Sequence, residues 1–107
     1  MLITTQDEFS GLEITETLGI VRGNSVRARH IGKDILALFR NIVGGEILEY
    51  TKLLAESREQ AMDRMIEDAN SKGADGIVCI RFTTSSIMQG AAELFVYGTA
   101  VKLKKKH

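Results

Sequence analysis

Two apolar segments constrain most strongly what this chain can fold into. "GIVCIRFTT" (76–84) and "ELFVYGTAVKLK" (93–104) are rich in β-branched and aromatic residues, which favours two strands. A sheet that is covered on one face should alternate apolar and polar side chains. Neither segment alternates in this way, so the sequence predicts a sheet that is apolar on both faces.

The expected faces follow from the period of two along a strand. In the first segment we expect one face to carry Val78, Ile80 and Phe82, and the other to carry Ile77 and Cys79. In the second segment we expect one face to carry Phe95, Tyr97 and Val101, and the other to carry Leu94, Val96 and Ala100. The linking sequence "SSIMQGAA" is small and polar, which indicates an antiparallel hairpin with a loose loop.

The N-terminal part also reads as strand. "LITT" (2–5) predicts a short strand, and residues 13–29 are dense in β-branched side chains. Gly23 and Asn24 interrupt the second segment. They fit either a two-residue hairpin turn or a bulge in one long strand, and the sequence leaves both readings open.

Two helices are expected in the middle of the chain. Residues 33–43 carry apolar side chains at spacings of three and four, and the pair Gly44-Gly45 ends this short helix. A long helix follows over 46–72, with Gly73 as its C-terminal cap. At 1.5 Å per residue it would be roughly 40 Å long, which is long for so small a domain. Its apolar stripe comprises Ile47, Tyr50, Leu54, Ala61, Met65 and Ala69, widened by Leu48, Leu53, Met62 and Ile66.

This element order predicts one α+β domain over residues 1–107, an antiparallel sheet with the short and the long helix on one face. Two helices in so short a chain cover only one side of the sheet. Further copies of the same chain are the simplest cover for the second apolar face. We therefore expect a homo-oligomer.

Composition excludes several classes of function. The chain has 14 basic and 14 acidic residues, so no global field attracts nucleic acid or an anionic membrane. No stretch approaches the roughly 20 apolar residues of a membrane helix, and the N-terminus lacks the pattern of a secretory signal. The single cysteine, Cys79, fits a reducing compartment. The expected location is the cytoplasm.

The chain also resembles a known family. "ITTQDEFSG", "LGIVRGNSV", "KDILALFRNIVGG", "EYTKLLAESREQAMDRMIEDANSKGADGIVCIRF" and "VYGTAVKL" occur in the order and spacing of the YbjQ-like family. That family is catalogued as "putative heavy-metal-binding" and is uncharacterised biochemically. The resemblance implies a dodecin-like α+β subunit, a homopentamer, and a structural corner at Gly44-Gly45. A phosphate loop there is disfavoured, because the Gly-x-x-x-x-Gly-Lys-Ser/Thr pattern is absent.

A heavy-metal site is the chemistry that needs testing against the residues. Soft metals take three or four convergent thiolate, thioether or imidazole ligands. The candidate ligands are Cys79 and His30, each of which also fits an ordinary structural role. No Cys-x-x-Cys or His-x-x-x-His spacing occurs, so only a symmetric ring could gather one residue per subunit into a site. The carboxylates Asp63, Glu67 and Asp68 are an alternative for harder metals, although such clusters are usually solvated.

No pattern in the chain predicts a catalytic site. Thr84, Ser85 and Ser86 have no base at a predictive spacing, and Arg40 and Arg81 fit surface pairing better than anion binding. The reading that remains is a homo-oligomeric binding or scaffold protein with any small-molecule or metal site at subunit interfaces or on the ring axis. The alternative is an enzyme with an active site assembled from two subunits, and no cofactor is indicated for either.

Overall fold

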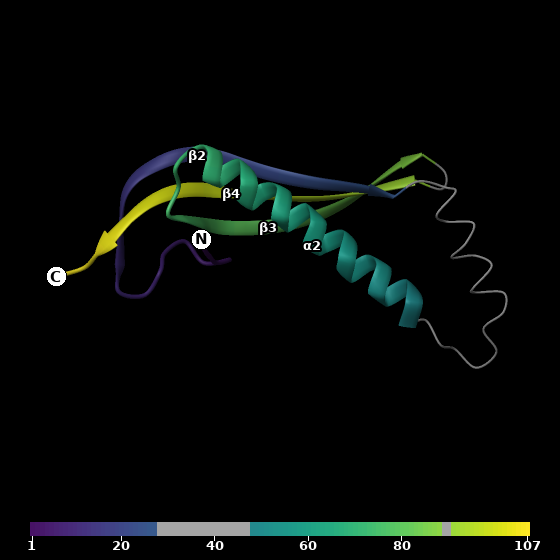
Figure 1. Ribbon diagram of the computed structural model, residues 1–107, viewed down its shortest axis with the longest axis horizontal. Helices are drawn as coiled ribbons and strands as arrows, with labels where there is room; N and C mark the ends of the chain where they lie inside the picture. Colours follow the sequence, from purple (N-terminus) through teal and green to yellow (C-terminus); the bar gives the residue numbers. More distant parts are fainter. Residues whose placement is uncertain (28–47, 89–90) are drawn as a thin grey trace.

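The computed structural model describes residues 1–27, 48–88 and 91–107, and it confirms the α+β class (Figure 1). Its elements are β1 (Leu2–Ile3), β2 (Leu12–Arg27), α2 (Leu48–Ser71), β3 (Gly76–Met88) and β4 (Ala91–Lys105). The strands form one four-stranded sheet, and α2 lies on one of its faces. The predicted short helix over 33–43 and the Gly44-Gly45 corner lie outside the described residues.

The strands are ordered β1-β3-β4-β2, so β4 is flanked by the two other long strands. It pairs antiparallel with both β2 and β3. The predicted antiparallel arrangement therefore holds for the long strands. The two-residue β1 pairs parallel with β3 and makes the sheet mixed. The predicted loose loop is shorter than expected, because β3 runs to Met88 and β4 begins at Ala91.

Strand β2 continues through Gly23 and Asn24, which settles the choice between a hairpin and one long strand. Gly23 lies opposite Val96 and Asn24 opposite Phe95 in an unbroken register with β4. Glycine is required at position 23 for close packing against α2, not for a turn. A Cβ at this position would overlap the backbone of α2 at Ala61 and Met65. The glycine thus allows the helix to lie directly against the strand.

A bulge in β3 changes which side chains face the helix. Cys79 has a φ of 57°, an uncommon value for a residue with a side chain, and the register shifts between Val78 and Arg81. Val78 lies opposite Thr99, whereas Ile80 belongs to the core beneath α2. The prediction that Val78 and Ile80 share a face is therefore wrong, because the extra residue reverses the alternation.

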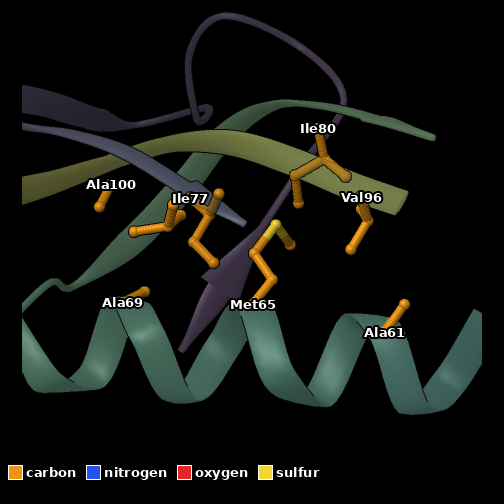
Figure 2. Close-up of a cluster of buried hydrophobic side chains, with 8 residues drawn as sticks. Ala61, Met65, Ala69, Ile77, Ile80, Val96 and Ala100 are labelled. Atoms are coloured by element: carbon orange, nitrogen blue, oxygen red, sulfur yellow. The ribbon is translucent and has the colours of Figure 1, made fainter. Parts of the chain in front are cut away.

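The core lies between α2 and the sheet face that α2 covers (Figure 2). Ala61, Met65 and Ala69 of α2 are fully buried, which confirms this part of the predicted apolar stripe. Fully burying a side chain the size of Met65 contributes about 1.5–3 kcal/mol. The sheet contributes Val21 from β2, Ile77 and Ile80 from β3, and Val96 and Ala100 from β4.

The C-terminus of α2 has the predicted glycine cap. Gly73 has a φ of 74°, a left-handed conformation that glycine adopts without strain. Its N–H donates to the carbonyl of Asn70 at 3.0 Å, and the N–H of Ala74 donates to that of Ala69 at 3.1 Å. These two bonds form a Schellman motif, which ends the helix and turns the chain into β3.

Candidate functional site

The sheet face opposite α2 carries the candidate site and is here called the helix-free face, because no helix within residues 1–27, 48–88 and 91–107 covers it. Tyr97 on β4 lies directly between Arg22 on β2 and Arg81 on β3. Directly opposite residues in antiparallel strands point to the same face with Cβ atoms about 4.5–5.5 Å apart. The neighbouring Val96 is fully buried beneath α2, so Tyr97 points away from the helix. One row across three strands thus places a tyrosine between two arginines.

A second aromatic ring extends this row along β4. Phe95 and Tyr97 are two residues apart on the same face, with ring centroids 5.7 Å apart and ring planes inclined at 31°. Phe95 is half-buried, and 39% of Tyr97 is exposed. The predicted placement of Phe95 and Tyr97 on one face is confirmed. Two adjacent rings with an accessible surface can stack against a planar group.

The two arginines differ in how firmly they are held. Nη1 of Arg81 donates to the carbonyl of Thr5 at 2.8 Å and to that of Ile80 at 2.8 Å, which holds its guanidinium at the β3 side of the row. Arg22 is exposed, and it makes no ion pair with any acid in the described part of the chain. Its charge is therefore available to an anion.

Polar and apolar groups surround this row on the helix-free face. Nδ2 of Asn24 donates to Oε2 of Glu93 at 3.0 Å. Ile20 and Val26, which lie on either side of the row along β2, are 63% and 47% exposed. The far end of the face is closed, since a Cβ on Gly76 would lie 2.9 Å from the ring of Phe9. The open part is a mixed surface of rings, aliphatic groups and cations.

The flank of α2 covers the outer edge of β2 near the site. The backbone N–H of Arg22 donates to Oδ2 of Asp68 at 3.3 Å. Nη1 of Arg64 donates to the carbonyl of Asn24. These bonds satisfy edge groups that would otherwise be free to pair with another strand. They fix α2 to β2 beside the row without using the guanidinium of Arg22.

A buried hydroxyl pair joins α2 to the sheet. Oγ of Ser57 donates to Oγ of Ser25 at 3.0 Å, and Oγ of Ser25 donates to Oε1 of Gln60 at 2.9 Å. The two serines are 3% and 1% exposed. A closed network of this kind satisfies its own members, so it serves to position the helix.

The structure describes one of the two predicted metal ligands, Cys79. Cys79 lies in the β3 bulge, half-buried, and its N–H donates to the carbonyl of Gln6 at 2.9 Å. His30 lies outside the described residues. Met65 is fully buried in the core, which removes its thioether as a ligand. No group of three or more His, Cys, Asp or Glu side chains suited to a metal ion occurs within residues 1–27, 48–88 and 91–107.

The helical carboxylates likewise do not form a site. Asp68 accepts from the β2 edge and lies 3.5 Å from Nζ of Lys72, whereas Asp63 and Glu67 are exposed. Thr84 and Ser85 lie on β3 and are exposed. Neither side chain donates a hydrogen bond to a base within the part of the chain that the structure covers. The arrangement there is suited to binding rather than to nucleophilic catalysis.

Sequence reasoning found part of the row and missed the rest. It placed Tyr97 on a face with Phe95 and named Arg81 as one of two arginines that could meet an anion; the other, Arg40, lies outside the described residues. It did not single out Arg22, because only the register between β2 and β4 places that residue beside Tyr97. None of the described helices combines the length and the apolar character needed to cross a membrane.

Comparison with known proteins gives consistent matches over nearly the whole chain. Residues 1–104 match the YbjQ family described as "Putative heavy-metal-binding". A UPF0145 protein of Methanosarcina acetivorans is 53% identical over 106 residues, which cover 99% of this chain and 100% of the relative. A UPF0145 protein of Photobacterium profundum is 59% identical over 103 residues, covering 96% and 100%.

A solved structure supports the fold. It is a protein of unknown function from Pediococcus pentosaceus, assigned to the DUF74 family, and it is 18% identical to this chain. The match has a TM-score of 0.63 and covers 97% of this chain and 98% of the other. At this identity the likeness concerns the fold alone.

Proposed function

Because the chain belongs to the YbjQ-like family, we propose that it is a cytoplasmic, homo-oligomeric binding or scaffold protein whose ligand site lies at subunit interfaces or around a ring axis. The pentameric state and the dodecin-like description of the subunit are taken from the resemblance to that family. The observation that carries the proposal is the helix-free face, which leaves apolar side chains in contact with water. Ile20, Val26 and Tyr97 are 63%, 47% and 39% exposed on it.

The shape of the chain also supports assembly. Its radius of gyration is 17.5 Å and its extents are 59 × 27 × 17 Å. A compact domain of this length has a radius of gyration of about 13 Å. A single chain this extended leaves much of its apolar surface uncovered, and neighbouring copies would bury it.

The sheet edges suggest how copies would join. β2 is an edge strand, and β3 is an edge strand beyond Ile80, because residues 2–6 border it as far as that residue. Two different edges favour a head-to-tail contact, in which β2 of one copy lies beside β3 of the next, and such contacts form a ring when the rotation between copies closes. Because Arg64 and Asp68 already occupy the β2 edge at Asn24 and Arg22, strand pairing would use residues on either side of them.

Assembly is tested by light scattering after size-exclusion chromatography over a wide range of concentrations. We expect a mass of about 59 kDa, five times that of the 11.8 kDa chain. Ile20→Lys places a charge on the helix-free face and should dissociate the oligomer. Asn70→Lys adds the same single positive charge at an exposed position of α2 and should not. A wild-type protein that remains a single chain at every concentration contradicts the proposal.

The heavy-metal description of the family requires a separate test. The donors described in one chain do not fit a soft-metal site, because Cys79 has no second thiolate or imidazole grouped with it. In a ring, Cys79 or His30 would recur once per subunit. Elemental analysis after incubation with Zn²⁺ or Cd²⁺ tests whether the protein binds a heavy metal. A specific site takes up metal stoichiometrically, and this uptake is lost in Cys79→Ser or His30→Ala. Adventitious uptake is the same in both variants as in the wild type.

A further inference from the structure

The row Arg22–Tyr97–Arg81 on the helix-free face is the most distinctive chemical grouping outside the core. We propose that this row and Phe95 bind a small planar anion of the mononucleotide class, with its ring stacked on Phe95 and Tyr97 and its phosphate at Arg22. The inference deepens the proposed function, on which it rests, because the row lies on a sheet face of one chain and neighbouring subunits would provide the walls of the site.

The rings define the first requirement for the ligand. The ring centroids of Phe95 and Tyr97 lie 5.7 Å apart, and both side chains are on the same side of β4. A heteroaromatic base stacks on such rings regardless of its hydrogen-bonding edge. An anion without a ring would leave this surface unused.

The charges define the second requirement. β4 places the carboxylate of Glu93 on this face near the row, and its Oε2 already accepts a hydrogen bond from Asn24. Arg22 and Arg81 flank Tyr97 from the two adjacent strands. Adjacent strands are about 4.8 Å apart, so both arginines originate within one small ligand's width of Tyr97. Nη1 of Arg81 already donates to two backbone carbonyls, so Arg22 is the arginine assigned to the phosphate. A planar guanidinium binds phosphate through paired N–H groups.

The number of cations limits the size of the ligand. Two guanidinium groups can neutralise about two phosphate charges. The chain as a whole has a formal net charge of zero. A polynucleotide needs a longer cationic track, so the row is suited to a single nucleotide.

The row would also lie at the subunit boundary of the proposed ring. Arg22 is on β2, one outer strand of the sheet, and Arg81 is on β3 where the bordering N-terminal residues end. If β2 of one copy lies beside the part of β3 beyond Ile80 in the next, the row of one subunit lies near its neighbour. Each boundary would then present an arginine beside an aromatic ring.

Isothermal titration calorimetry of the full chain with AMP, GMP, UMP and CMP tests the inference, with inorganic phosphate and adenosine as separate probes. We expect at least one nucleotide to bind at least about tenfold more tightly than phosphate or adenosine alone, because both halves of the ligand are recognised. Arg22→Gln and Tyr97→Val should each weaken binding by about tenfold or more. Tyr97→Phe retains the ring and should bind within about threefold of wild type.

The matched control is Arg58→Gln, which removes the same charge from an exposed position on α2 and should leave affinity unchanged. Light scattering on the same samples separates the two proposals. An intact oligomer that binds none of the four nucleotides overturns the inference and leaves assembly standing. A monomer that binds AMP with the expected variant pattern supports the inference and overturns assembly. Phosphate binding as tightly as every nucleotide overturns the inference, as does equal affinity in Arg22→Gln and Arg58→Gln.

Discussion

Replacing Gly23 with alanine tests how closely α2 lies against the sheet. A methyl group at this position would overlap the carbonyl oxygen of Ala61 and the amide nitrogen of Met65. Both are backbone atoms of one helix, so no rotamer change in a neighbouring side chain can relieve the overlap. The helix must move away from β2, and the buried stripe that includes Met65 must lose contact with the sheet.

The expected cost follows from two opposing effects. Overpacking that side chains can partly absorb costs about 1–3 kcal/mol, and displacement of a helix belongs at the upper end of that range. Replacing glycine with alanine also stabilises the folded state by about 0.4–1 kcal/mol, because the unfolded chain becomes less flexible. The net loss should be about 2 kcal/mol or more, which lowers Tm by roughly 10 °C in a domain of this size.

Chemical denaturation at a fixed subunit concentration measures this loss, because the stability of an oligomer depends on concentration. Asn24→Ala is the matched control. It changes the next residue of β2 to the same side chain, but on the exposed helix-free face, where it removes only the hydrogen bond to Glu93. We expect Asn24→Ala to cost less than about 1 kcal/mol. Equal unfolding free energies for the two variants would refute the close approach of α2 at Gly23.

Three further substitutions test individual contacts, each by denaturant unfolding. Ser25→Ala removes both hydrogen bonds of the buried hydroxyl pair and should cost about 1–3 kcal/mol, more than Ser57→Ala. The double variant should cost no more than Ser25→Ala alone, and additive losses would contradict a coupled network. Gly73→Ala forces a side chain into a left-handed conformation and should cost about 1–2 kcal/mol, whereas no loss would mean that the cap is dispensable. Asp68→Ala frees the N–H of Arg22 on the β2 edge, so it should cost about 1 kcal/mol and increase light scattering on storage. Unchanged stability and scattering would show that this contact does not protect the edge.

Local sequence signals predicted the elements of this fold well. β-Branched density identified β2, the spacing of Ala61, Met65 and Ala69 identified the buried side of α2, and Gly73 identified its end. Each of these signals is carried by residues a few positions apart, and each reflects a local preference of the backbone.

Features that depend on pairing between strands distant in sequence could not be predicted from the sequence. The left-handed conformation of Cys79 moves Ile80 to the helix side, and cysteine carries no sequence signature for such a bulge. The proximity of Arg22 to Tyr97 depends on two irregularities in β2, between Ile14 and Glu16 and between Thr17 and Gly19, which set the register with β4. A strand pattern predicts faces, but it does not predict which residues lie opposite each other.

The central position of β4 also determines when the fold can form during synthesis. Residues 91–105 leave the ribosome after β2, α2 and β3, yet both β2 and the greater part of β3 depend on β4 for their strand pairing. Until then β2 has no strand partner, and β3 has only the two-residue β1. We infer that the nascent chain stays incompletely folded until β4 emerges, with long unpaired strands that chaperones recognise.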